Sequence, residues 1–286
     1  MQVRFADRAE GGVTATVLNA KYTRGNVVGT NFNWATSGNA AYVATTSTAD
    51  GYGLASMALY GLPAFSDDKV LAGDAGNDTV NYRENYLAGA GVGIDASLMR
   101  GTVVLGAGTD TLIDIENLGG TDAADRLVGD ANDNRIEGYG GGDILSGGRG
   151  NDVLAGGIGS DTYLYSAGDG KDILVDRDAV TGHTDMLTLT DIDQTQLWFR
   201  HLGNDLQIDV LGTADQIVVK DWYVGGVSGA DNHIERIRTA DGRTLYDSDV
   251  DKLVHAMAAF APPQAGQTRW TNGQASNAQV LLAVTH

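Results

Sequence analysis

The chain has 286 residues with 40 glycines, 3 prolines and no cysteine, and its formal net charge is −18 at pH 7. Because 42% of the residues are apolar, the composition favours a folded, turn-rich chain of two domains, or one elongated repeat structure with attached segments, over a disordered one. The acidic charge argues against nucleic acid and anionic membranes as partners and in favour of cations. The lack of cysteine excludes a disulfide framework.

Residues 1–66 are predicted to be a β-rich N-terminal segment, because Thr, Asn, Ala and aromatic residues alternate there in short stretches. The segment is either a small binding domain or the end of a longer protein that packs on the first coil, and its shortness favours the second interpretation. Its first residues, MQVRFADRAEGG, lack the apolar core of a cleaved signal peptide. The chain also has no apolar run of the length that a transmembrane helix needs.

A β-roll is predicted for residues 67–178. One nine-residue copy comes first, at 73–81, and we expect that a single copy has no neighbour on which to stack. Residues 82–119 contain strand-like runs separated by glycines and are predicted to form coils with wider turns, because Leu118 lies nine residues before Leu127. The candidate metal ligands in the first copy are Gly73, Ala75, Gly76 and Asp78.

The nine-residue pattern then recurs in five copies over residues 120–164. Six glycine-rich residues favour a tight turn with positive φ angles, and the three residues that follow are strand-like. Two copies make one coil of 18 residues, so copies two apart stack on the same edge. The apolar residues of the eighth position should then line two inner faces, with Leu127, Leu145 and Tyr163 on one and Ile136 and Leu154 on the other.

An acid or an amide occupies the sixth position of every copy: Asp125, Asn134, Asp143, Asp152 and Asp161. Stacking should place Asp143 beside Asp125 and Asp161 on one edge, and Asp152 beside Asn134 on the other. Close carboxylates repel one another unless a hard cation binds them together with turn carbonyls. Magnesium requires stricter octahedral geometry, and zinc prefers His or Cys, which the repeats lack. We therefore expect several calcium ions.

Glycine lets the backbone approach an ion closely, so the turn carbonyls are further candidate ligands. In the three fullest copies these belong to Gly138, Gly140, Gly141, Gly147, Arg149, Gly150, Gly156, Ile158 and Gly159. Gly129 and Ala131 are the candidates in the second copy. Copies 120–128 and 129–137 lack glycines of the pattern, so sites that use their turns should be weak or vacant.

Copies 147–155 (GGRGNDVLA) and 156–164 (GGIGSDTYL) match the pattern G-G-x-G-x-D-x-U-x, and copy 138–146 departs from it only at Tyr139. The segment resembles the RTX, or haemolysin-type calcium-binding, β-roll, most strongly over 138–164. A flexible Gly/Asp-rich linker would not keep an apolar residue in fixed register. The resemblance implies export by type I secretion machinery without a cleaved N-terminal signal, a secreted or cell-surface location, and folding on calcium outside the cell.

After the fifth copy the period shifts by two residues and resumes as AGDGKDILV, with Asp172 in the sixth position and Leu174 in the eighth. This segment is predicted to end the roll. Asp169, Asp172 and Asp176 either close a last calcium site or only solvate the end of the coil.

Residues 179–247 are predicted to form an antiparallel β capping domain, since a bare coil end is an unpaired sheet edge. Leu206, Ile208 and Val210 alternate with polar residues as in a half-buried strand, and Asp241 and Gly242 suit a hairpin turn. Residues 197–223 resemble the domain often found directly after RTX repeats. Trp198, Trp222 and Tyr223 are interpreted as core aromatics that cover the end of the roll.

Residues 248–286 contain a predicted amphipathic helix and a tail. The helix should span 248–260, with Ser248 as N-cap, a shared face of Val250, Leu253, Val254 and Met257, and two prolines beyond its end. Helix and tail together resemble the uncleaved C-terminal signal of proteins exported by type I secretion. The alternative is a helix that docks on the capping domain.

The sequence contains no H-E-x-x-H, G-x-S-x-G or P-loop motif. Its five histidines are scattered and are interpreted as structural or solvated. The chain is therefore expected to be no enzyme, and any catalytic domain of a parent protein should lie outside it. The leading hypothesis is the calcium-binding RTX region of a type I secreted bacterial protein, with an all-β fold and one C-terminal helix. The alternative is an adhesin or carbohydrate-binding module that binds a surface glycan or host ligand.

Overall fold

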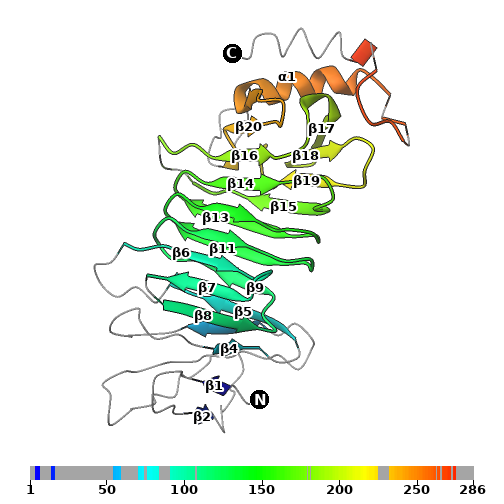
Figure 1. Ribbon diagram of the computed structural model, residues 1–286. Helices are drawn as coiled ribbons and strands as arrows, with labels where there is room; N and C mark the ends of the chain where they lie inside the picture. The colour runs from blue at the N-terminus through cyan, green and yellow to red at the C-terminus, as the bar shows by residue number, and fades with distance from the viewer. Residues whose placement is uncertain are drawn as a thin grey trace.

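The computed structural model describes residues 4–6, 14–16, 54–58, 70–73, 76–83, 91–106, 108–178, 180, 182–224, 232–261, 263–264, 266–271 and 273–274. Within these ranges the chain is mostly β-strand, and its α-helix, α1 (Asp247–Ala258), lies at one end of a stack of strands (Figure 1). The all-β class with a C-terminal helix is therefore confirmed.

Two long sheets make up the stack, beside a short antiparallel pair, β1 (Arg4–Ala6) and β2 (Thr14–Thr16). The ten-stranded sheet contains, in chain order, β4 (Val70–Ala72), β6 (Ile94–Ser97), β7 (Thr102–Leu105), β8 (Gly108–Ile113), β10 (Arg126–Val128), β12 (Ile144–Ser146), β14 (Thr162–Tyr165), β16 (Met186–Leu189), β20 (Arg236–Arg238) and β21 (Thr244–Tyr246). The nine-stranded sheet contains β3 (Leu54–Ala58), β5 (Asn77–Asn81), β9 (Asn117–Gly119), β11 (Arg135–Gly140), β13 (Val153–Ile158), β15 (Lys171–Val175), β17 (Leu197–Leu202), β18 (Asp205–Val210) and β19 (Gln216–Val219).

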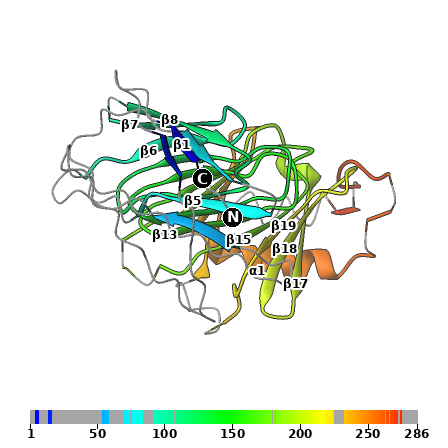
Figure 2. The same cartoon turned by 90° about the horizontal axis from the view of Figure 1, so that it is seen from below.

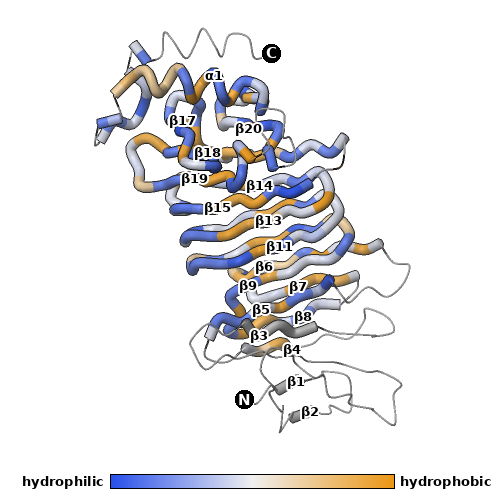
Figure 3. The backbone as a smooth tube through the Cα atoms, turned by 180° about the vertical axis from the view of Figure 1, so that it is seen from behind, coloured by the Kyte–Doolittle hydropathy of each residue, from blue (hydrophilic) through white to orange (hydrophobic). Residues whose placement is uncertain are grey.

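The repeats place successive strands alternately in the two sheets. Leu127, Leu145 and Tyr163 are register partners in one sheet, and Ile136 and Leu154 are partners in the other. All five side chains are at most 1% exposed, so the two predicted inner faces are confirmed. Figure 2 looks along the stack, and Figure 3 shows an apolar stretch recurring on strand after strand with hydrophilic residues at the strand ends.

The coil also extends back to Leu118, as predicted, because Leu118 pairs with Ile136. Two expectations about the preceding segment are wrong. The single copy at 73–81 does stack, since its strand β5 pairs in parallel with β9 and places Val80 beside Leu118. Residues 94–113 are not wider coils, because β6, β7 and β8 form an antiparallel meander in the ten-stranded sheet. The meander supplies the facing sheet that lets the single copy stack.

The roll continues past the repeats. After the fifth copy the period is longer by two residues. The strand register is nevertheless kept, because Leu174 pairs with Leu154. Beyond residue 178, β16 pairs in parallel with β14, β19 with β15 and β20 with β16. The predicted antiparallel β capping domain at 179–247 is therefore confirmed only in part, because three of its strands continue the roll in parallel. Among the described residues of 179–247, antiparallel pairing joins β17 with β18, β18 with β19, and β20 with β21, which is the predicted hairpin.

The end of the stack is covered by large apolar side chains. Trp198 and Trp222 are buried, as expected of core aromatics, and Tyr223 is partly buried against them. The indole of Trp222 stacks on the His233 ring at a centroid distance of 4.1 Å. Burial also follows the predicted pattern on α1, where Val250, Leu253, Val254 and Met257 are the buried residues.

Helix α1 begins one residue earlier than predicted. Its N-cap is Tyr246, which makes no side-chain cap hydrogen bond, so the assignment of Ser248 as cap is wrong. Asp247 and Asp249 supply acidic charge in the first turn, where the helix dipole favours it. No helix in the described part of the chain has the length and apolarity needed to cross a membrane. The predictions for residues 1–66, apart from three short strands, and for residues 275–286 lie outside the described residues.

Candidate metal centre

The residues of the sixth position form a ladder along each edge of the roll. On one edge the backbone N–H of Asp125 donates to Asp143 Oδ1 at 2.8 Å, and that of Asp143 donates to Asp161 Oδ1 at 2.8 Å. On the other edge, Asn134 N–H donates to Asp152 Oδ1 at 2.7 Å. Each of these contacts spans 18 residues, so the predicted stacking of the sixth position on both edges is confirmed.

The second oxygen of these carboxylates has no partner. Asp143, Asp152 and Asp161 are at most 1% exposed, and their Oδ2 atoms accept no hydrogen bond. Burying a carboxylate oxygen without a partner destabilises a fold by several kcal/mol. In native structures such oxygens are therefore paired with a donor or coordinate a metal ion. Three such atoms in successive copies therefore indicate binding positions for cations.

The first glycine of each copy opens space beside this oxygen. A β-carbon on Gly138 would lie 2.1 Å from Asp143 Oδ2 and 2.6 Å from the carbonyl oxygen of Gly156. A β-carbon on Gly147 would likewise lie 2.0 Å from Asp152 Oδ2. Any side chain at these glycines would fill the position toward which the carboxylate and a turn carbonyl converge. The donor set consists of oxygen alone, which is the set that calcium prefers.

Electrostatics support the same conclusion. Burial raises the pKa of Asp143 to about 8 and that of Asp172 to about 8. Burial also raises the pKa of Asp152 and that of Asp161 to about 6. Neighbouring carboxylates add to the shift at each site, while the ladder hydrogen bonds oppose it. The protein thus disfavours the charged form of these groups, and a bound divalent cation would restore it.

The two incomplete copies, 120–128 and 129–137, differ from the complete ones in the hydrogen bonds that their sixth-position oxygens accept. In copy 120–128, Asp125 Oδ2 accepts from the Thr121 N–H at 2.5 Å, and Asp125 Oδ1 accepts from the N–H of Ile94 at 2.7 Å. In copy 129–137, Asn134 Oδ1 accepts from the Asp130 N–H at 2.8 Å. Protein donors here occupy the atoms that stay free in the complete copies. These hydrogen bonds support the prediction, made from the missing glycines, that these turns bind an ion weakly or not at all, and it stays a prediction.

The other predicted ligands lie in the turns along the same edges. A β-carbon on Gly159 would lie 1.4 Å from the carbonyl oxygen of Gly141, and one on Gly150 would lie 2.5 Å from that of Asn132, so neighbouring turns are in backbone contact. The Ile158 carbonyl accepts from the Gly141 N–H at 2.9 Å. The remaining carbonyl candidates in these turns are those of Gly129, Ala131, Gly140, Arg149 and Gly156.

The first copy joins the ladder through Asp78, whose backbone N–H donates to Glu116 Oε2 at 2.7 Å. Gly73 faces the Asp78 carboxylate, because its β-carbon would lie 2.5 Å from Asp78 Oδ2. Gly76 has a positive φ of 155°. Ala75 lies outside the described residues.

The acids after the repeats do not form the trio that the sequence suggested. Asp172 Oδ1 accepts from the Asp152 N–H at 3.0 Å, so Asp172 extends one ladder. Asp169 Oδ2 accepts from the Ser166 N–H at 2.7 Å. Asp176 instead lies with Asp161 and Asp185, within a group whose carboxylate oxygens are all within 4.8 Å of one another. The structure thus divides the predicted trio between the two ladders.

Sequence reasoning missed three acids that act as rungs of these ladders: Glu116, Asp185 and Glu235. A signal for each was present, since every one stands two residues before a buried apolar strand residue, namely Leu118, Leu187 and Ile237. A search restricted to the nine-residue period passes over them, because the connecting loops have other lengths.

Comparisons with known proteins agree with this geometry. Two overlapping stretches, 119–154 and 137–174, match the RTX calcium-binding nonapeptide repeat in four copies, and residues 205–249 match the haemolysin-type calcium binding protein related domain. Iron-regulated protein FrpA of Neisseria meningitidis serogroup C is 36% identical over 94 residues, which cover 32% of this chain and 8% of FrpA. The chain thus spans a small fraction of that relative's length.

A solved structure, the extracellular lipase LipA from Serratia marcescens, aligns with 59% of this chain and 33% of the lipase, at 16% identity and a TM-score of 0.27. The complete copies, the free buried carboxylate oxygens and the family matches converge on one assignment. This chain carries RTX calcium-binding nonapeptide repeats that bind several calcium ions, followed by a haemolysin-type calcium binding protein related domain.

Proposed function

We propose that this chain is the calcium-dependent folding region of a protein exported by type I secretion, and that it folds when it meets calcium outside the cell. The observation that carries the proposal is the set of buried, unpartnered Oδ2 atoms of Asp143, Asp152 and Asp161. Without a cation, the folded repeats confine negative charge that the unfolded chain exposes to water. The repeats of the apo chain should therefore be unfolded at neutral pH, and calcium should shift them to the folded form.

The packing of the repeats also supports folding that depends on bound calcium. Each copy contributes one large buried apolar residue, such as Leu145 or Leu154, to the space between the sheets. Ordering nine residues costs on the order of 10 kcal/mol of backbone entropy at 1–2 kcal/mol each, whereas burying one Leu gains about 2 kcal/mol. Stacking and bound ions must supply the rest, so an isolated copy cannot fold.

Export through a narrow channel favours a chain that stays unfolded inside the cell. A formal charge of −18 and the absence of cysteine suit this requirement, because charge repulsion expands the chain and no disulfide forms prematurely. We place the export signal in residues 248–286, in agreement with the predicted helix and tail. Any catalytic or toxic activity of the parent protein would reside outside this chain, which spans 8% of the length of FrpA.

Circular dichroism with and without calcium tests the proposal. We expect the repeats of the chelated chain to contribute a coil spectrum, and saturating calcium to increase the β signal to that of the complete roll. Magnesium at the same concentration serves as the control and should not reproduce the change, because its octahedral preference suits rigid, water-containing sites. An unchanged β spectrum in excess chelator would refute coupled folding.

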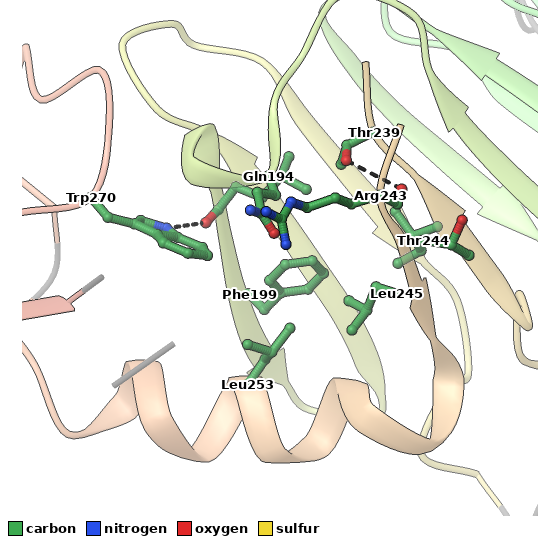
Figure 4. Close-up of a pocket in the computed structure, with 10 residues that line it drawn as sticks. Gln194, Phe199, Thr239, Arg243, Thr244, Leu245, Leu253 and Trp270 are labelled. Carbon is green, nitrogen blue, oxygen red and sulfur yellow. Dashed lines mark hydrogen bonds between the residues drawn. The ribbon is translucent and has the colours of Figure 1, made fainter. Parts of the chain in front are cut away.

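We further propose that the described part of the chain binds ions and does not catalyse a reaction. A pocket beneath α1 is lined by Phe199, Leu245 and Leu253, and its volume of about 20 Å³ is close to the minimum for one water. In Figure 4 the Trp270 ring stands at its edge, where Nε1 donates to the Leu197 carbonyl at 2.7 Å. A glycan-binding role would therefore fall to residues 1–66, which a glycan array with that segment would test.

A further inference from the structure

Tyr139 stands in a backbone conformation that suits glycine. It occupies the second position of copy 138–146, where the two complete copies carry Gly148 and Gly157. Those glycines have φ angles of 94° and 106°, and Tyr139 has a φ of 75°. A bulky side chain in this left-handed region strains the backbone and persists only where surrounding contacts hold it in place. Tyr139 therefore needs contacts that offset this strain.

The side chain of Tyr139 contacts the end of the first copy, 73–81. Asn81 Nδ2 donates a hydrogen bond to the Tyr139 hydroxyl oxygen. The Arg83 guanidinium lies over the Tyr139 ring, 4.6 Å from its centroid, which is a favourable cation–π distance. Arg83 Nε also pairs with Asp122 Oδ1 at 3.1 Å, and the Arg83 N–H donates to Asn81 Oδ1 at 2.9 Å. Asn81, Arg83 and Tyr139 thus form one connected set of contacts, which we call the clasp.

The clasp spans two strand spacings of the nine-stranded sheet. Asn81 is the register partner of Gly119, and Gly119 is the register partner of Glu137, two residues before Tyr139. Neighbouring strands lie about 4.8 Å apart, so a side chain on the middle strand would separate the outer two. Gly119 has none, and a β-carbon there would lie 2.8 Å from Asn81 Cγ. The Asn81 side chain therefore lies over Gly119 and can contact β11.

Protein groups hold the first copy to the repeats on this edge of the roll. The turn of Tyr139 stacks on turn 120–125, where both oxygens of Asp125 accept from N–H donors, those of Ile94 and Thr121. An ion in that turn is expected to bind weakly or not at all. The clasp needs no ion, because its contacts join an amide, a guanidinium and a phenol.

We propose that Tyr139 is a positioning residue that, through the clasp, fixes the first copy in register on the calcium-bound repeats. Glycine at this position would relieve the backbone but would remove both the acceptor for Asn81 and the ring beneath Arg83. The inference goes beyond the proposed function, because it assigns a role to a departure from the repeat pattern that binds no ion. Its link to calcium rests on that function: repeats that unfold without calcium no longer hold Tyr139 in place, so the first copy should loosen with them.

The alternative is that Tyr139 is only a strained replacement for glycine. In that case Tyr139→Gly would relieve the strain, and every part of the roll would become as stable as before or more so. The clasp predicts the opposite sign for the first copy, which should lose stability, while the repeats keep theirs. The two interpretations therefore differ in the direction of one local effect.

Hydrogen exchange of the full chain at saturating calcium, followed by mass spectrometry, tests the clasp through Tyr139→Gly. We expect the amides of β5 to exchange about tenfold faster or more, because a hydrogen bond and a cation–π contact are lost. Those of β12 and β14 should exchange at the wild-type rate. Arg135→Gln is the matched control, since it removes an ion pair with Glu137 from the same strand and should leave β5 unchanged. Wild-type exchange of β5 in Tyr139→Gly, or equal acceleration in β5 and β14, would overturn the proposal.

A double-variant cycle keeps the test decisive if Tyr139→Gly does not fold. Tyr139→Phe keeps the ring beneath Arg83 and removes only the hydroxyl, and Asn81→Ala removes the donor. Because both changes break the same hydrogen bond, the double variant should exchange in β5 no faster than Asn81→Ala alone. Single-variant accelerations that multiply in the double variant would overturn the clasp. Wild-type repeats that gain no protection from calcium would instead refute the proposed function.

Discussion

The repeats and the segment after them treat acidic side chains in opposite ways. In the repeats, Asp143 and Asp152 each bury a carboxylate oxygen that accepts no hydrogen bond. In the post-repeat segment, Asp205 accepts from Lys220 Nζ at 2.6 Å and from the Asp221 N–H at 2.9 Å. Asp209 similarly pairs there with an Arg, Arg200, at 2.6 Å. The repeats leave these carboxylate oxygens for ions, whereas Lys220 and Arg200 neutralise the two acids of β18.

The two regions also differ in their apolar cores. A repeat copy buries one large apolar side chain, whereas β17 alone buries Leu197, Trp198 and Phe199. Helix α1 adds a further apolar layer over β17. We infer that the post-repeat segment carries its own stability, while the repeats depend on ions. The segment can then serve as a preformed surface on which the last coil stacks, because β15 pairs directly with β19.

Removing calcium should give the largest difference in stability between the repeats and the post-repeat segment. In excess chelator we expect the amides of β11 to β14 to exchange rapidly, and those of β17 to β19 to keep much of their protection. Each ion held at 100 times its Kd stabilises the fold by about 2.7 kcal/mol, so losing several ions removes a free energy comparable to the stability of a typical domain. Hydrogen exchange with mass spectrometry measures both regions in one sample. Equal loss of protection in both would contradict the inferred difference in stability.

Glycine substitutions should give the next largest difference between the repeats and the post-repeat segment, in both calcium binding and stability. Gly159→Ala places a β-carbon 1.4 Å from the carbonyl oxygen of Gly141 at a φ of 151°, so the turn must move and calcium binding should be lost. Gly203 has a φ of 65°, and no atom would lie within 4 Å of a β-carbon added there, which makes Gly203→Ala the control. The control should lower the free energy of unfolding by about 1–2 kcal/mol and leave calcium binding intact. Calcium titration followed by thermal melts would compare the two variants.

Removing one carboxylate charge should act with opposite sign in the two metal states. Asp143→Asn keeps an oxygen for the ladder bond from Asp125 but removes the buried charge. With calcium, we expect the affinity to fall by about tenfold or more, which is about 1.4 kcal/mol per tenfold. Without calcium, the variant should be more folded than the wild-type chain, since an uncompensated charge is gone.

Asp133→Asn is the control for this variant, because Asp133 is exposed and stands outside the sixth position. Its calcium affinity should stay at the wild-type value. Equal effects of Asp133→Asn and Asp143→Asn in a calcium titration would mean that the ladder does not mark the binding positions.

The smallest effect is expected for an ion pair of the post-repeat segment. Lys220→Gln removes the contact with Asp205, but the Lys220 side chain is 39% exposed, so solvent screens the pair. The free energy of unfolding should fall by less than about 1 kcal/mol, with no change in calcium affinity. Denaturant titration at saturating calcium measures the first quantity. A change in calcium affinity would show that the two regions are coupled more tightly than their contacts indicate.

The nine-residue period was sufficient to predict the inner faces of the roll, the two ladders and the complete copies. Those contacts join residues one coil apart, and the repeated local pattern sets the coil length. The single copy at 73–81 shows where this reasoning fails. Its partner Leu118 is separated from Val80 by an antiparallel meander, and no local pattern specifies that pairing. The same holds for β16, whose parallel pairing with β14 crosses a loop of irregular length.

The chemistry of this protein could be read from its amino acids in order, because glycine turns, acids in the sixth position and one apolar residue per copy specify a metal-binding coil through local, repeated spacing. Which carboxylate oxygens remain free depends instead on packing between coils. Asp125 and Asp143 occupy the same position of the pattern, yet Thr121 supplies a donor to Oδ2 of the first and nothing supplies one to Oδ2 of the second. That difference, and the meeting of Asp161 with Asp176 and Asp185, arises from contacts that the period does not encode.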